Sequence, residues 1–155
     1  MKHLTGATLL IGYGNPGRLD DGLGPAAAER AQQWKIPGLT VETGYQLAVE
    51  HAELAAGFDV VIFADAAVNG CEPFEWKPIQ PRTTIAFSTH HVAPETILGL
   101  AHTVFQSEVK GYALAIRGYV FDDFGERLSP QAEQNLAAAL GHMESLFRQT
   151  PCRSS

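Results

Sequence analysis

Short apolar blocks alternate along this chain with segments in which apolar residues recur at helical spacing. Uninterrupted or alternating blocks bounded by turn residues predict strands, and apolar positions three and four residues apart predict amphipathic helices. The pattern predicts strands over residues 7–13, 39–43, 59–65, 83–87 and 112–120, with a short edge strand at 73–77. It predicts helices that begin at Pro25, span 47–56 and 94–106, and follow the cap Ser129–Pro130.

This alternation of strands and helices predicts an α/β fold, a three-layer sandwich with a twisted, mostly parallel sheet between helices, of the phosphorylase/hydrolase-like kind. We expect one domain over residues 1–150 and a frayed tail at 151–155. Ligands of such sheets bind beyond the carboxyl ends of the strands. The loops most relevant to function are therefore the segments 14–24, 43–46, 65–69, 88–93 and 118–126.

Composition narrows the classes of function. The 155 residues are 45% hydrophobic and 18% charged, which is typical of a globular chain rather than a disordered one. A net charge of −6 disfavours nucleic acid as the main partner, because phosphate binding needs clustered cations. Two cysteines are too few for a disulfide scaffold. With no apolar run long enough to span a membrane and no signal-peptide pattern, we expect a soluble, cytoplasmic protein.

The first loop contains a match to the dinucleotide-binding motif GxGxxG. It is the sequence Gly12-Tyr13-Gly14-Asn15-Pro16-Gly17, which follows a predicted strand. A dinucleotide site requires the helix to begin within this motif, so that its amides face the pyrophosphate. Here the chain continues through Asp20 and Asp21, whose carboxylates would repel phosphates. Nucleotide binding is therefore a minor alternative.

Acidic and histidine side chains follow three of the predicted strands. Asp20 and Asp21 lie in the first loop, Asp65 ends the strand 59–65, and His90 and His91 follow the strand 83–87. Each has a structural alternative: helix capping for Asp20, a turn carboxylate for Asp65 and a surface role for a histidine. Two carboxylates and one imidazole at one sheet edge would suit a divalent metal ion with open coordination positions. The nucleophile motif GxSxG and the zinc motif HExxH are both absent.

On these loops the chain resembles the [NiFe]-hydrogenase maturation endopeptidases. The segments that carry the resemblance are LLIGYGNPGRLDDGLG (9–24), VVIFADAA (60–67), FSTHHVAPETIL (87–98) and the C-terminal stretch 117–140. The resemblance implies a peptidase that removes a C-terminal extension from the hydrogenase large-subunit precursor. It also implies that cleavage follows nickel insertion, and that the nickel, supplied by the substrate, is recognised.

The resemblance places both the metal-binding and the catalytic roles on Asp21, Asp65 and His90, with His91 as the alternative to His90. It also suggests that glycines of the first loop let the substrate tail approach, and that Arg117 either contacts that tail or forms a structural ion pair. The alternative function is a module that binds or senses a divalent metal without peptidase activity. The sequence leaves the oligomeric state and the particular hydrogenase open.

Overall fold

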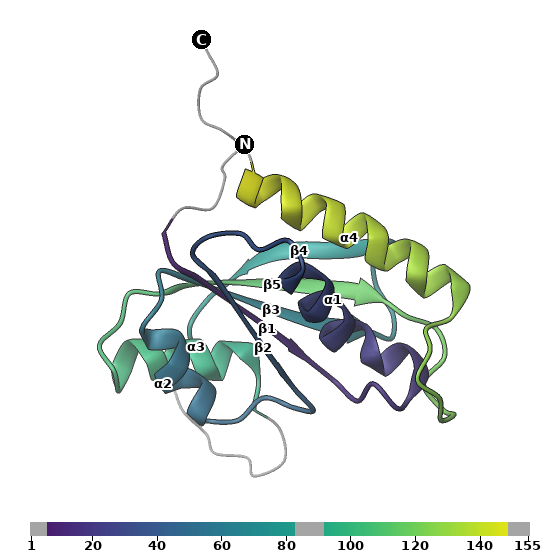
Figure 1. The fold of residues 1–155 in the computed structure, drawn as a ribbon. Coiled ribbons are helices and arrows are strands. Elements are labelled where there is room, and N and C mark those ends of the chain that lie inside the picture. The colour runs from purple at the N-terminus through teal and green to yellow at the C-terminus, as the bar shows by residue number, and fades with distance from the viewer. Residues whose placement is uncertain (1–5, 83–91, 149–155) are drawn as a thin grey trace.

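The structure is a computed structural model that describes residues 6–82 and 92–148. Its centre is one five-stranded sheet between two layers of helices (Figure 1). The strands are β1 (Thr8–Tyr13), β2 (Leu39–Gly44), β3 (Val60–Ala67), β4 (Phe74–Ile79) and β5 (Lys110–Arg117). The helices are the 3₁₀ helix η1 (Leu19–Gly22) and the α-helices α1 (Leu23–Gln32), α2 (Glu50–Ala56), α3 (Pro94–Thr103) and α4 (Pro130–Arg148).

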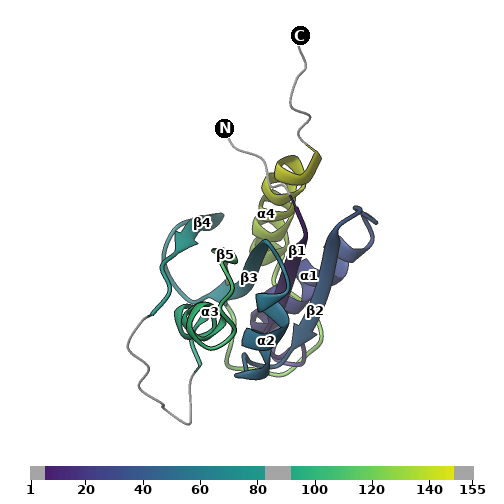
Figure 2. The same ribbon diagram turned by 90° about the vertical axis from the view of Figure 1, so that its left-hand side faces the viewer.

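The sheet is buried on both faces, which explains its nearly continuous apolar strands. Helices α1 and α4 cover one face, and α2 and α3 cover the other (Figure 2). Side chains of a strand point alternately to the two faces, so Leu10 joins the core under α1 and α4 while Leu9 and Ile11 join the core under α2 and α3. The predicted three-layer α/β architecture is confirmed.

The strand order is β2-β1-β3-β5-β4, with all neighbours parallel except β4, which runs antiparallel to β5. From β1 the chain passes through α1 to β2 on one side, then through α2 back across β1 to β3. The two crossovers run in opposite directions, and this makes the gap between the carboxyl ends of β1 and β3 a topological switch point. Open α/β sheets bind ligands at this position.

Several predicted elements have different bounds in the structure. The strand predicted at 112–120 runs from Lys110 to Arg117. The Gly118 amide still donates to the Ala67 carbonyl at the end of β3, but the amides of Tyr119 and Val120 donate to the Asp20 carboxylate instead of a neighbouring strand. The helix predicted at 47–56 begins at Glu50. The residues before it form a turn, in which the Ala48 amide donates to a ring nitrogen of His51.

The other predicted elements of the described ranges are present with smaller shifts, except that α1 begins at Leu23 rather than Pro25 and α3 ends at Thr103 rather than residue 106; the Ser129 cap of α4 is confirmed. The predicted strand 83–87 and the predicted tail 151–155 lie outside the described residues, and the domain bounds remain a prediction. Within residues 6–82 and 92–148, no helix is both long enough and apolar enough to cross a membrane.

Candidate functional site

Asp65 lies where β3 leaves the side of β1. The last paired residues of these two strands are Gly12 and Ala64, so Tyr13 and Asp65 come one position later on neighbouring strands. Both positions have the parity of the side chains that face α2 and α3. Topology therefore places a phenol and a carboxylate next to each other at the switch point. The carboxylate is half-buried.

The environment of Asp65 disfavours its ionised form. Burial raises the pKa of its carboxyl to about 6, and the nearby charge of Asp21 contributes to the rise. Hydrogen bonds from the Ala66 amide, at 2.7 Å, and from the Tyr13 hydroxyl act in the opposite direction. The structure thus brings Asp21 and Asp65 close enough to repel each other, although 43 residues separate them in the sequence. Two acids that repel in a partly buried site favour a bound cation.

Asp21 is held at this site by the loop after β1. Its Oδ2 accepts the Asn15 amide at 2.9 Å, and the Asn15 side chain accepts the Gly17 amide at 2.9 Å. The side chain sits on η1, which contacts β3, and it is half-buried. These contacts leave one oxygen of Asp21 without a protein hydrogen bond among the described residues, so this oxygen can bind a ligand.

Asp20 has a different role from its neighbour. It is fully buried, and its oxygens accept the amides of Tyr119, Val120 and Ser129 at 2.7–3.1 Å and the Ser129 hydroxyl at 2.7 Å. Burial would raise the pKa of this carboxyl, but the hydrogen bonds, led by those from Ser129, outweigh it and lower the pKa below the ordinary value. The helix-capping alternative is wrong: neither η1 nor α1 has a side-chain cap. Asp20 anchors the loop after β5.

Internal packing requires glycine at two positions of the first loop and the start of α1. A Cβ at Gly24 would overlap with the carbonyl oxygens of Tyr13 and Ala64, so glycine lets α1 lie directly against β1 and β3. Gly14 has a φ of 142° and packs against the Asp21 carbonyl. Packing within the protein thus explains these two glycines, and the role of the first-loop glycines in substrate approach stays a prediction. The GxGxxG motif also ends at Gly17, before η1 begins at Leu19, so no helix begins within it.

Arg117 is structural, but not through an ion pair. Its guanidinium donates to the carbonyl oxygens of Gly70, at 2.9 Å, and Gly118, at 3.3 Å, and lies 5.0 Å from the centre of the Tyr119 ring. The ion pairs of the described ranges are Arg30–Glu133 and Arg148–Glu144, and neither includes Arg117. Its cation–π contact instead supports the segment that Asp20 anchors.

Sequence reasoning missed two residues near Asp65. Burial raises the pKa of the Tyr13 hydroxyl far above its ordinary range, and the charges of Asp65 and Glu95 add to the effect. Tyr13 therefore stays protonated and acts as a hydrogen-bond donor. Glu95, in the first turn of α3, belongs to the same electrostatic cluster. The sequence contains one indication of this role: Tyr13 ends a strand at the same sheet edge as the predicted acids.

His90 and His91 lie outside the described residues, so the structure does not test the third predicted ligand. Among the residues that the structure does describe, no group of three His, Cys, Asp or Glu side chains could hold a metal ion. The structure brings together the two predicted acids. It leaves the histidine as a prediction.

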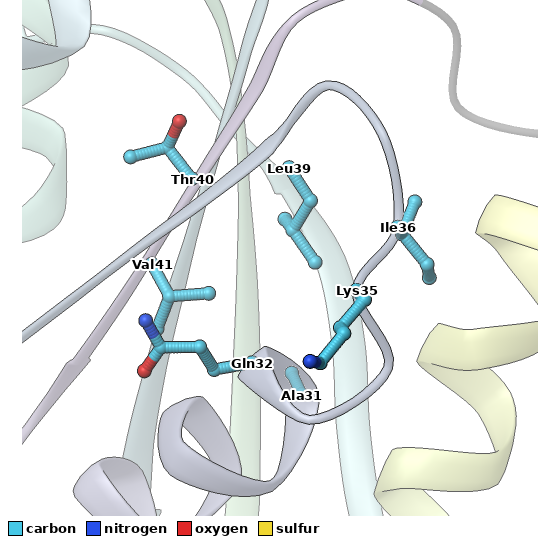
Figure 3. Close-up of a pocket in the computed structure, with 7 residues that line it drawn as sticks. All are labelled: Ala31, Gln32, Lys35, Ile36, Leu39, Thr40 and Val41. Carbon is cyan, nitrogen blue, oxygen red and sulfur yellow. The ribbon is translucent and has the colours of Figure 1, made fainter.

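A cavity of about 230 Å³ opens beside this site, between α1 and the end of β2. The lining residues are Gly14, Pro16, Pro25, Glu29, Thr43, Gly44 and Tyr45. Another cavity, of about 280 Å³, lies at the other end of β2, near the end of α1 (Figure 3). It contains no acid or histidine, and its only charged residue is Lys35.

Comparison with known proteins identifies the fold. No protein-family model and no curated protein sequence matches the chain. The [NiFe] hydrogenase maturation protease HycI from Thermococcus kodakarensis KOD1 is similar in structure, with a TM-score of 0.73 and 21% identity over 92% of this chain and 93% of that one. The hydrogenase maturating endopeptidase HybD from E. coli is also similar, with a TM-score of 0.73 and 18% identity over 94% of each chain. An uncharacterized protein from Wolinella succinogenes has a TM-score of 0.61 and 25% identity over 92% of this chain and 96% of that one. The chain thus has the fold of the hydrogenase maturation proteases.

Proposed function

We propose that this protein is a processing endopeptidase that removes the C-terminal extension of a [NiFe]-hydrogenase large-subunit precursor after nickel has been inserted. The observation that carries the proposal is the pairing of Asp21 and Asp65 at the switch point of a maturation-protease fold. The relatives of similar fold are named as maturation proteases, which supports hydrolysis of a peptide bond as the reaction class.

The two acids suit recognition of a cation that arrives with the substrate. Unoccupied, they repel each other in a partly buried site, and a nickel ion in the precursor would offset that repulsion. A precursor without the metal would leave the acids uncompensated, so the same repulsion would discriminate against it. Nickel dependence follows from this argument as part of the proposal.

We assign the third nickel contact to His90. This residue precedes Glu95 by five positions, and Glu95 is near enough to Tyr13 for its charge to raise the Tyr13 pKa. The chain thus returns to the site shortly after His90. An imidazole with two carboxylates is a ligand set that first-row metals such as nickel accept. The bound metal would position the scissile bond, and a water activated near a carboxylate or the metal would attack it.

We also propose that the protein acts in the cytoplasm. Cys71 is exposed and has no disulfide partner among the described residues, which agrees with a reducing compartment.

The decisive experiment is processing of a purified precursor. The protein is incubated with a nickel-loaded large-subunit precursor, and mass spectrometry follows the loss of the C-terminal peptide. We expect cleavage with nickel present and none with the nickel-free precursor. Absence of cleavage, under conditions in which an established maturation protease processes its own precursor, would overturn the proposal. Tight binding of free nickel by this protein without cleavage would instead support the metal-binding alternative.

A further inference from the structure

The two edges of the sheet differ in how they are protected. Exposed edges present unpaired backbone groups, and proteins commonly block them with lysine or proline. The edge strand β4 contains both, as Lys77 and Pro78. The opposite edge, β2, has the sequence LTVETG and contains neither. Within the described ranges, no strand pairs with the outer side of β2.

The register of β1 and β2 identifies the free backbone groups. The carbonyl oxygens of Gly38 and Gly44 accept the amides of Thr8, at 2.9 Å, and Gly14, at 3.0 Å, so the even-numbered residues of β2 bond toward β1. Alternation along a parallel ladder turns the N–H and C=O groups of Val41 and Thr43 outward. No described group bonds to them. An extended peptide could therefore add to β2 as a sixth strand.

Two cavities border one face of this edge. The cavity of about 280 Å³ includes Leu39 and Val41, which point toward the end of α1 while Thr40 points away (Figure 3). The cavity of about 230 Å³ includes Thr43 and Gly44. The residues of this edge that line them, 39–41 and 43–45, are centred four positions apart along the chain, about 13 Å in an extended strand, and side chains four positions apart in an added strand point to the same face. The spacing suits two side chains of one extended peptide.

The occupant of this edge is better identified as a different chain than as a second copy. Symmetric antiparallel pairing that uses the outward groups of both Val41 and Thr43 would place the exposed Glu42 of each copy directly opposite the other, and like charges across a strand pair are destabilising. The edge is also continuous with the acid pair, because Gly44 bonds to Gly14, which packs on the Asp21 carbonyl. A chain lying along β2 would thus pass beside the loop that carries Asp21.

We propose that β2 is the docking strand for the C-terminal extension of the precursor, which adds to the sheet edge and places side chains in the two cavities. This inference rests on the proposed function for the identity of the peptide. The outward backbone groups of Val41 and Thr43 supply main-chain hydrogen bonds, and the two cavities supply selectivity for side chains four positions apart.

Hydrogen exchange of the wild-type protein tests the docking without requiring cleavage. A synthetic peptide with the sequence of the precursor's C-terminal extension is added in excess. We expect the Val41 and Thr43 amides to exchange rapidly in the free protein and about ten-fold more slowly or better with the peptide bound. The amides of Thr40 and Glu42, already bonded to β1, should change little. Unchanged exchange at Val41 and Thr43, under saturating peptide, would overturn the docking proposal even if the precursor is processed.

Backbone N-methylation of the peptide gives a second test. Each N-methyl group removes one donor, so methylation at alternate positions should weaken binding about five- to ten-fold, while methylation at the positions between them should have little effect. A loss that does not alternate would contradict strand addition. On the protein side, Thr43→Pro removes an outward donor and should weaken binding more than Thr43→Val, which changes the same side chain but retains the donor. Protection of Val41 and Thr43 through concentration-dependent dimerisation without peptide would overturn the assigned occupant in favour of a second copy.

Discussion

Asp20 and Asp21 are adjacent carboxylates on one short helix, yet their surroundings differ in every respect that matters for function. Asp20 is fully buried and saturated with hydrogen bonds from the loop after β5. Asp21 is half-buried, accepts a single described hydrogen bond and repels Asp65. An acid that is satisfied by the protein stabilises the fold, and an acid left partly unsatisfied remains available to a ligand. The comparison therefore predicts that these neighbours fail differently when they are mutated.

The largest effect on stability is expected for Asp20→Ala. This change leaves the amides of Tyr119, Val120 and Ser129 without their acceptor, and the free energy of unfolding should fall by about 3–5 kcal/mol. Urea unfolding measures it. The matched control is Asp21→Ala, which should cost less than about 1 kcal/mol. Equal losses for the two variants would show that the contrast between the neighbours is wrong.

The next largest effect is a loss of activity when Asp21 or Asp65 is changed. Asp21→Asn and Asp65→Asn remove a charge with little change of shape, and each should reduce the rate of precursor processing by about 100-fold or more. His90→Ala should do the same, while each variant unfolds at a urea concentration close to or above that of the wild type. If His90→Ala processes normally and His91→Ala does not, the assigned histidine is off by one position. Normal processing by Asp65→Asn would remove the main support for the site.

The smallest effect is a dependence of stability on pH. The Asp65 carboxyl has a pKa of about 6 in the folded protein against an ordinary value of 3.8, so the folded state binds more protons between these values. The unfolding free energy attributable to Asp65 is therefore highest below about pH 4 and falls as the pH rises through 6. Asp65→Asn should remove this loss, giving a gain of about 1–3 kcal/mol at pH 8 and almost none at pH 4.

The contribution of Asp20 to stability depends on pH in the opposite direction. Its pKa is lowered in the folded protein, so its contribution is present above about pH 4 and is lost as the pH falls below its ordinary value. A series of urea midpoints between pH 3 and pH 8 for the wild type and Asp65→Asn separates the two carboxylates. A difference between these proteins that stays constant over the series would contradict the assigned pKa of Asp65.

Most of the secondary structure was predictable, because buried parallel strands and amphipathic helices have distinct apolar patterns. The predicted strand at 112–120 continues past the observed end of β5, and this error has a specific cause. Tyr119 and Val120 are as strand-like as the residues before them, but their amides bond to a carboxylate almost one hundred residues earlier. No local pattern contains that contact. For the same reason, the sequence alone does not distinguish Asp20 from a helix cap.

The candidate site was partly predictable for a topological reason. Asp21 and Asp65 each follow a strand, and parallel strands end at one edge, so their approach could be expected from the sequence. Tyr13 was not predicted as a site residue, because in the sequence it looks like the last apolar residue of a strand. Its proximity to Asp65 depends on the register between β1 and β3, which the sequence does not reveal.

The sequence by itself determined the order of the elements, the α/β class and the set of acids that follow strands. Only the tertiary structure decided how those acids divide between fold and function. Burial and the amides of a distant loop satisfied Asp20, while the switch point placed Asp21 against Asp65 and Tyr13 beside them. The physical reason is that local patterns report which face of an element is buried, whereas the environment of a carboxylate depends on groups from other elements.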